Sequence, residues 1–181
     1  PDKLPIRMES IRPDIEFRQS NRSADFIQGT EEEDSDDRFI NRGRMLHTLF
    51  SAIDTADDID SAIERLLFEG VISTREKEAE IRELVQKAFS SPEIQDWYSG
   101  TWTLFNECAI IYKEKGVLQT RRPDRVMMKD GQVVVVDFKF GKENAKYNKQ
   151  VKGYMQLLTR MGYKNITGYL WYVNEEKIEK V

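Results

Sequence analysis

Three ionisable side chains within residues 121–140, RRPDRVMMKDGQVVVVDFKF, could carry out chemistry together. Asp137 and Lys139 come directly after four consecutive valines, which predict a buried strand. Asp124 lies upstream of the pair Asp130-Gly131, and Asp-Gly is a strong signal for a two-residue hairpin turn. With that turn, Asp124 should face Asp137 across a pair of antiparallel strands.

This register places two carboxylates and an ammonium side by side at the end of a strand. Directly opposed residues have Cβ atoms about 4.5–5.5 Å apart, and the alternation of a strand puts Lys139 on the same face as Asp137. Opposed carboxylates repel, and a shared divalent cation with oxygen ligands is the simplest reason for the pair. The lysine could stabilise developing negative charge or orient a water nucleophile. The alternative is a solvated Asp–Lys pair at the surface.

Composition and charge narrow the class of protein. The chain has 181 residues, a net charge of −4, 39% apolar and 33% charged residues, and a single cysteine, which predicts one soluble domain without disulfides. Residues 1–112 hold 13 Lys and Arg against 24 Asp and Glu, whereas residues 113–164 hold 13 against 5, local charges of −11 and +8. A basic half suits a phosphate-binding face, and a solvated basic face is the alternative.

The N-terminal residues and the single cysteine, Cys108, lead to further predictions. Residues 1–30 lack the apolar core of a signal peptide, and no apolar run is long enough to span a membrane, so a cytoplasmic location is expected. The first residue is Pro1 rather than methionine, which is typical of a fragment of a longer protein. Cys108 is expected to be a small buried residue in a strand.

Periodicity predicts helices first and a sheet afterwards. The acidic stretch 28–39 lacks apolar periodicity and is interpreted as part of a linker or partly disordered segment over residues 1–41. Residues 42–181 would then form the folded domain, of class α/β. Helices are predicted at 42–53, 57–70, 73–89, from 91 and at 145–162, and strands at 103–113, 116–128, 132–140 and 166–173.

The acidic and basic residues discussed above follow one another along the chain in an order that resembles the PD-(D/E)xK nuclease core. Pro123-Asp124 looks like its first half and Asp137-Phe138-Lys139 its second. The chain is most similar to the RecB-type subgroup, because GRMLH (43–47) resembles its Gly-x-x-x-His and QVKGY (150–154) its Gln-x-x-x-Tyr. The resemblance covers residues 42 to about 173 and implies a restriction-endonuclease-like core: a central mixed β-sheet flanked by helices, with an N-terminal helical region.

The resemblance also implies roles at the metal. His47, Asp124 and Asp137 would hold Mg²⁺ or Mn²⁺ together with the carbonyl of Phe138, and Lys139 would assist the attacking water. Gly43, four residues before His47, would let the helix approach the sheet closely. With one cysteine, the chain cannot hold the iron–sulfur cluster of AddB-type relatives.

Gln150 and Tyr154 would position the scissile strand. They are four residues apart, so they share one face of a helix, and packing on the sheet brings both towards Asp137. Basic residues nearby are expected to follow a DNA backbone: Arg122, Lys142, Lys146 and Lys149. The structural alternatives are a core tyrosine with its hydroxyl at the rim and a solvated glutamine.

The function implied by the resemblance is an exodeoxyribonuclease domain of an ATP-dependent helicase–nuclease, acting in DNA break repair and recombination. A UvrD/Rep-like helicase region upstream, of the RecBCD or AddAB kind, and a second subunit would be its partners, with DNA as substrate and no membrane association. A Gly-Lys-Ser/Thr phosphate loop is absent from the sequence. The alternatives are a non-catalytic DNA-binding clamp on the same fold and a structural domain.

Overall fold

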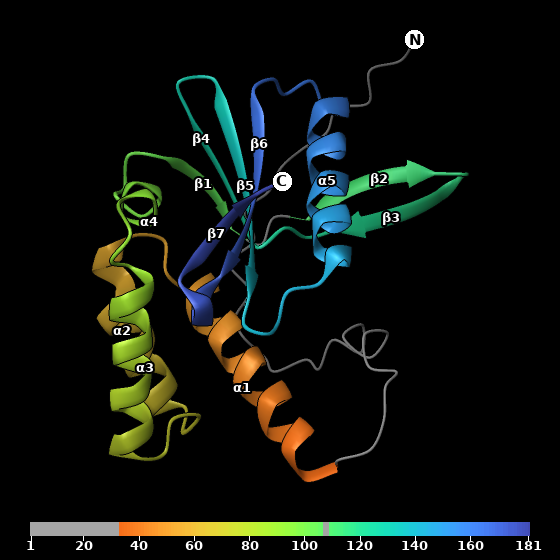
Figure 1. Cartoon of the computed structure of the whole chain (residues 1–181). Helices are drawn as coiled ribbons and strands as arrows, with labels where there is room; N and C mark the ends of the chain where they lie inside the picture. The colour runs from red at the N-terminus through yellow and green to blue at the C-terminus, as the bar shows by residue number, and fades with distance from the viewer. Residues whose placement is uncertain (1–32, 107–108) are drawn as a thin grey trace.

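The structure is a computed structural model that describes residues 33–106 and 109–181, with side chains described for residues 41–105 and 109–181. Figure 1 shows a helical part followed by a sheet with one long helix packed beside it. In chain order the elements are α1 (Glu33–Ser51), η2 (Ala56–Asp58), α2 (Ile59–Phe68), α3 (Arg75–Ala88), α4 (Pro92–Trp97), β1 (Thr103–Asn106), β2 (Ile110–Glu114), β3 (Val117–Arg121), β4 (Arg125–Lys129), β5 (Gln132–Lys139), α5 (Ala145–Arg160), β6 (Ile166–Tyr172), η3 (Val173–Glu175) and β7 (Lys177–Lys180).

The main sheet has five strands in the order β1-β4-β5-β6-β7. Strands β5 and β6 run parallel and are joined through α5, whereas the other neighbours are antiparallel. Strands β2 and β3 form a separate two-stranded sheet. The predicted α/β class, a central mixed sheet flanked by helices after an N-terminal helical region, is therefore confirmed.

The alternation of β5 divides the core into two layers. Val134, Val136 and Phe138 pack in the cluster formed with helices α1 to α4, while Val133 and Val135 pack against α5. Because both faces are covered, the strand reads as an uninterrupted apolar run until it reaches Asp137. The predicted division of the strand between two faces is correct.

The turn between β4 and β5 sets the register. Asp130 and Gly131 have φ angles of 50° and 78°, as a two-residue turn with both central residues left-handed requires. The ladder pairs Lys129 with Gln132 and runs to Arg125 opposite Val136. The predicted register holds over this ladder, which ends one residue before Asp124.

Helix α5 lies unusually close to β6, and Gly168 makes this possible. A Cβ at Gly168 would lie 2.6 Å from both the Met155 sulfur and Val151 Cγ1. Glycine at this position therefore fixes the distance between α5 and the sheet, and with it the height of the side chains that α5 directs towards the end of β5.

Two predicted strands are wrong in extent. Residues 116–128 form β3 and β4 rather than one strand, because Pro123 has no N–H for a ladder and the chain bends at residues 122–124. Residues 103–113 likewise divide between β1 and β2. Strand β7 was not predicted, since it is only four residues long and Ile178 is its one apolar residue.

The N-terminal boundary also differs from its prediction. Helix α1 begins at Glu33, so residues 33–41 are helical rather than part of a linker. The rest of the predicted linker, residues 1–32, and Cys108 lie outside the described residues. In the part of the chain that is described, no helix is long and apolar enough to cross a membrane.

Candidate active site

Asp137 and Lys139 meet at the carboxyl end of β5. The Asp137 side chain is buried, with the residue 2% exposed, and Lys139 Nζ lies 2.5 Å from its Oδ2. This contact is an ion pair by distance, whereas by hydrogen-bond geometry Oδ2 has no partner in the described structure. A buried carboxylate oxygen is therefore held next to an ammonium with acceptor capacity to spare.

Asp124 joins the pair from the segment before β4. Its Oδ2 accepts a hydrogen bond from the backbone N–H of Phe138 at 2.6 Å, so this carboxylate is fixed to the strand that carries Asp137. Its Oδ1 lies 2.6 Å from His47 Nε2. The expected proximity of the two aspartates is present, although Asp124 is held through its side chain rather than by the ladder.

His47 reaches the site from α1, on the helical side of the sheet. Its side chain is 39% exposed, and its ring centroid lies 6.4 Å from that of Phe138. The role predicted for Gly43 is wrong, since a Cβ there would have no heavy atom within 4 Å. Leu46, Leu49 and Phe50 bury α1 instead, and this packing carries His47 to the end of β5.

The electrostatics of Asp137 follow from its surroundings. Burial and then the nearby charge of Asp124 raise the pKa of its carboxyl, and Lys139 lowers it, so that the pKa is raised to about 7. Lys139 is thus the partner that favours the ionised carboxylate. Such a shifted carboxyl beside a second acid is typical of catalytic sites.

Helix α5 contributes a chain of polar side chains, as its spacing predicts. Lys139 Nζ donates to Gln150 Oε1 at 3.2 Å, Gln150 Nε2 donates to the Tyr154 hydroxyl at 2.8 Å, and that hydroxyl donates to the Arg122 carbonyl at 3.2 Å. Burial and then the charge of Asp137 raise the pKa of Tyr154. Tyr154 is therefore both a core residue and a member of this hydrogen-bonded series of side chains. Gln150 is hydrogen-bonded to Lys139.

Two side chains of this region were missed from the sequence. Tyr147 presents its ring 4.1 Å from Lys139 Nζ, a cation–π contact that holds the ammonium from a second side. Its spacing of three and seven residues from Gln150 and Tyr154 was the available signal. Arg125 is 1% exposed and joins β4 to α4 and to the segment that follows α1; an arginine at the start of an apolar strand was its only signal.

The predicted DNA-contacting residues lie in segments next to the cluster in the chain. All four are exposed: Arg122, Lys142, Lys146 and Lys149. Lys146 and Lys149 are three residues apart on the first turns of α5, Lys142 lies in the preceding loop, and Arg122 leads into Asp124. Their contact with DNA stays a prediction.

The donor set fits a divalent cation, although it is not arranged as a ready metal site. Among the described residues, no group of three or more His, Cys, Asp and Glu side chains is placed to hold a metal. The contacts explain this, since His47 and Asp124 bind each other and Lys139 covers Asp137. The buried carboxylate of Asp137, with a second carboxylate nearby, offers the oxygen ligands that Mg²⁺ and Mn²⁺ prefer.

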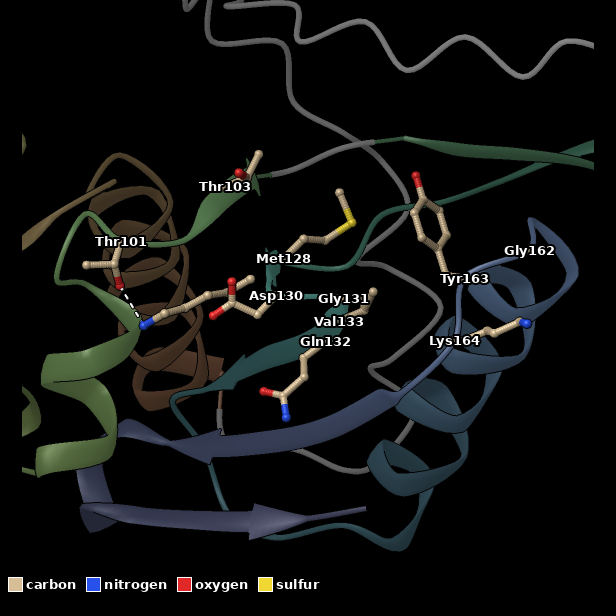
Figure 2. A pocket seen from close by; sticks show the side chains of 11 residues that line it. Thr101, Thr103, Met128, Asp130, Gly131, Gln132, Val133, Gly162, Tyr163 and Lys164 are labelled. Carbon is tan, nitrogen blue, oxygen red and sulfur yellow. Dashed lines mark hydrogen bonds between the residues drawn. The ribbon is translucent and has the colours of Figure 1, made fainter.

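A pocket of about 620 Å³ lies elsewhere, at the opposite end of β5. Figure 2 shows the β4–β5 turn and Tyr163 around it, with Lys129 donating to the Thr101 hydroxyl at 3.0 Å. No unsatisfied buried side chain lies among its lining residues. The cluster of Asp124, Asp137 and Lys139 lies at the other end of the strand.

Replacing Asp137 with asparagine should stabilise the metal-free protein at pH 8, by on the order of 2 kcal/mol in the free energy of unfolding. Because the folded-state pKa of Asp137 is raised to about 7, the unfolded state loses this proton first and wild-type stability falls between about pH 4 and 7. The asparagine side chain does not ionise, so the variant does not lose stability in this way as the pH rises.

Urea denaturation in EDTA at pH 5 and pH 8 measures the effect, and Glu64→Gln on the exposed face of α2 is the matched control. If the variant were no more stable than wild type at pH 8, the ionised Asp137 carboxylate would not destabilise the folded state.

Comparison with known protein families identifies the family of the chain. A model described as the PD-(D/E)XK nuclease superfamily matches residues 21–181. No curated protein matches the chain.

Proposed function

Because the chain belongs to the PD-(D/E)XK nuclease superfamily, we propose that it is a divalent-metal-dependent exodeoxyribonuclease domain. Members of this superfamily are generally nucleases, hence hydrolases, and they generally use divalent metals such as Mg²⁺. The mixed sheet flanked by helices is consistent with their restriction-endonuclease-like fold. The observation that carries the proposal is the cluster of Asp124, Asp137 and Lys139 at the end of one buried strand.

The residues that would hold the cation are Asp124, Asp137 and His47, with the carbonyl of Phe138. A bound divalent cation would supply Lewis-acid polarisation of the phosphate and would lower the pKa of the attacking water. Lys139 would have to move from Asp137 to make room for it. Gln150 and Tyr147 give the ammonium a second set of contacts, so it can leave Asp137 without leaving the site.

The chain's own groups would then divide the reaction among them. Lys139 brings positive charge to the phosphate, where negative charge develops as the phosphodiester is attacked. Gln150 and Tyr154 hold the lysine and the backbone at Arg122 in fixed relation, which orients the strand being cut. Phe138 N–H keeps Asp124 from turning away from the site.

The finer assignment rests on the resemblance to RecB-type nucleases. In it, a UvrD-like helicase region and a second subunit deliver single strands of DNA to this domain during break repair and recombination in the cytoplasm. Delivery raises the effective concentration of substrate, so an isolated domain with a net charge of −4 needs little affinity of its own.

Linear and covalently closed circular DNA test the exonuclease assignment. With Mg²⁺ we expect labelled linear strands to shorten from an end, while a closed single-stranded circle of the same sequence stays intact. Cutting of the circle would reassign the domain as an endonuclease. Intact linear and circular DNA would instead support the non-catalytic clamp.

Replacing His47 with alanine should weaken Mn²⁺ binding about tenfold, the lower end of what loss of a ligand or its supporting group costs. His47 Nε2 lies 2.6 Å from Asp124, so it either binds the cation or orients the carboxylate that does. Calorimetric titration measures the affinity, and Thr48→Ala on the next position of α1 is the control. Equal affinity in the His47 variant would make the histidine a packing residue.

A further inference from the structure

The separate ribbon of β2 and β3 is anchored at one end and open at the other. Ile110 at its base is 3% exposed and packs in the core cluster with Val126 and Val133. The strands are joined by Lys115 and Gly116, with φ angles of 49° and 84°. Figure 1 shows the ribbon extending past α5, away from the main sheet.

One face of this ribbon carries apolar side chains in the open. Ile111 faces Thr120 and Lys113 faces Leu118, so these four share a face. Ile111 is 57% exposed and Leu118 is 72% exposed. The opposite face carries Tyr112, which packs against the core cluster. The face of Ile111 and Leu118 is therefore directed away from the core cluster, and a further exposed apolar residue, Val117, lies beside the turn on the other face.

The charge of the ribbon identifies the kind of partner. Residues 110–122 contain four basic side chains and one acidic residue, Glu114, a net charge of +3 on a chain of net charge −4. The basic residues are all exposed: Lys113, Lys115, Arg121 and Arg122. Protein interfaces are depleted of lysine at their centres, whereas a polyanion with apolar bases matches cations mixed with exposed apolar groups.

The ribbon also runs directly into the active site. Strand β3 ends at Arg121, and Arg122 and Pro123 connect it to Asp124. The Arg122 carbonyl accepts the hydrogen bond from Tyr154, so the root of the ribbon belongs to the polar chain that ends at Lys139. A strand lying along the ribbon would be led to the carboxylates.

We propose that the β2–β3 ribbon binds single-stranded nucleic acid, with unstacked bases against Ile111 and Leu118 and phosphates at Lys113 and Lys115. This inference rests on the proposed nuclease function and adds the element that holds the substrate. Base faces are open in a single strand and covered by stacking in a duplex, so the apolar face selects unpaired strands. The basic side chains of the ribbon can contact the phosphates of single-stranded and duplex DNA alike.

Fluorescence anisotropy of the full chain with labelled 20-nucleotide single strands and blunt duplexes, in EDTA, tests the ribbon. The double variant Ile111→Ser, Leu118→Ser should weaken single-strand binding about tenfold and change duplex binding much less. Phe68→Ser is the control, because Phe68 is 93% exposed on α2, outside the ribbon. A second variant, Lys113→Ser, Lys115→Ser, should reduce the slope of log affinity against log salt by about 1.4 for single strands.

Hydrolysis of the small diester thymidine 5′-(p-nitrophenyl phosphate) with Mn²⁺ separates binding from chemistry. The ribbon variants should hydrolyse it at the wild-type rate, since it reaches the site without the ribbon. Unchanged single-strand affinity in both variants overturns the proposal. Unchanged affinity with a shift from dimer to monomer in sedimentation overturns it too and assigns the face to a second copy of the chain.

Absence of nuclease activity would give a different set of results from absence of DNA binding by the ribbon. A wild-type chain that hydrolyses neither DNA nor the diester contradicts the proposed function, whereas the ribbon is still judged by the affinities alone. A ribbon variant that also loses diester hydrolysis overturns the proposal, because the ribbon would then act on the fold of the site rather than on DNA.

Discussion

Replacing Lys139 with methionine should lower the rate of DNA cleavage by about a hundred- to a thousandfold, the usual effect of removing one group that stabilises transition-state charge. The methionine keeps most of the side-chain volume and removes only the ammonium. Lys139 Nζ contacts Asp137, Gln150 and Tyr147, and the last two would keep the ammonium at the site when a cation binds at Asp137. Asp137→Asn should reduce cleavage at least as much.

Single-turnover cleavage of a labelled strand at saturating Mg²⁺ measures the rate, with circular dichroism to verify folding. Lys152→Met is the matched control, since Lys152 is an exposed lysine on the same helix as Gln150. The Lys152→Met protein should cleave at the wild-type rate. Wild-type cleavage by a folded Lys139→Met protein would remove this lysine from the mechanism.

Replacing Arg125 with methionine should lower the free energy of unfolding by about 3–5 kcal/mol, the range for breaking a buried charge network. Its guanidinium donates to the carbonyls of Ile53, Asp54 and Trp97 at 3.1, 2.8 and 2.8 Å. It also lies 3.8 Å from the Tyr98 ring centroid. The variant leaves buried carbonyls without donors, each of which costs about 1–3 kcal/mol.

Thermal and urea denaturation measure this loss, and Arg65→Met, an exposed arginine on α2, is expected to change stability by less than about 0.5 kcal/mol. Arg125→Lys should restore little, because one ammonium cannot supply the forked donors that reach carbonyls of two segments. An Arg125→Met protein as stable as wild type would show that the clamp contributes nothing net.

Local patterns predicted the core of the site because they act within one hairpin. Asp130-Gly131 fixes the β4–β5 register, and the alternation of β5 decides that Asp137 shares a face with Lys139. The spacing of Gln150 and Tyr154 placed them together on α5. These relations need only backbone geometry, which short stretches of sequence already specify.

Contacts between distant segments could not be predicted in this way. Arg125 is an ordinary charged residue in the sequence, and only the approach of α4 and of the segment after α1 gives its guanidinium three carbonyl partners. The position of Asp124 depends on a bend at Pro123, which a pattern of strand residues conceals. Tyr147 gains its role only once Lys139 lies over its ring.

The central claim is that the cluster at the end of β5 is a metal-dependent nuclease site. Cleavage of 5′-labelled single-stranded DNA by the purified chain, measured against Mg²⁺ concentration, tests it most directly. The rate should rise with Mg²⁺ and saturate, fall to background in EDTA, and return when Mn²⁺ is added. Cleavage that persists undiminished in EDTA, or no cleavage with either cation, would contradict the claim.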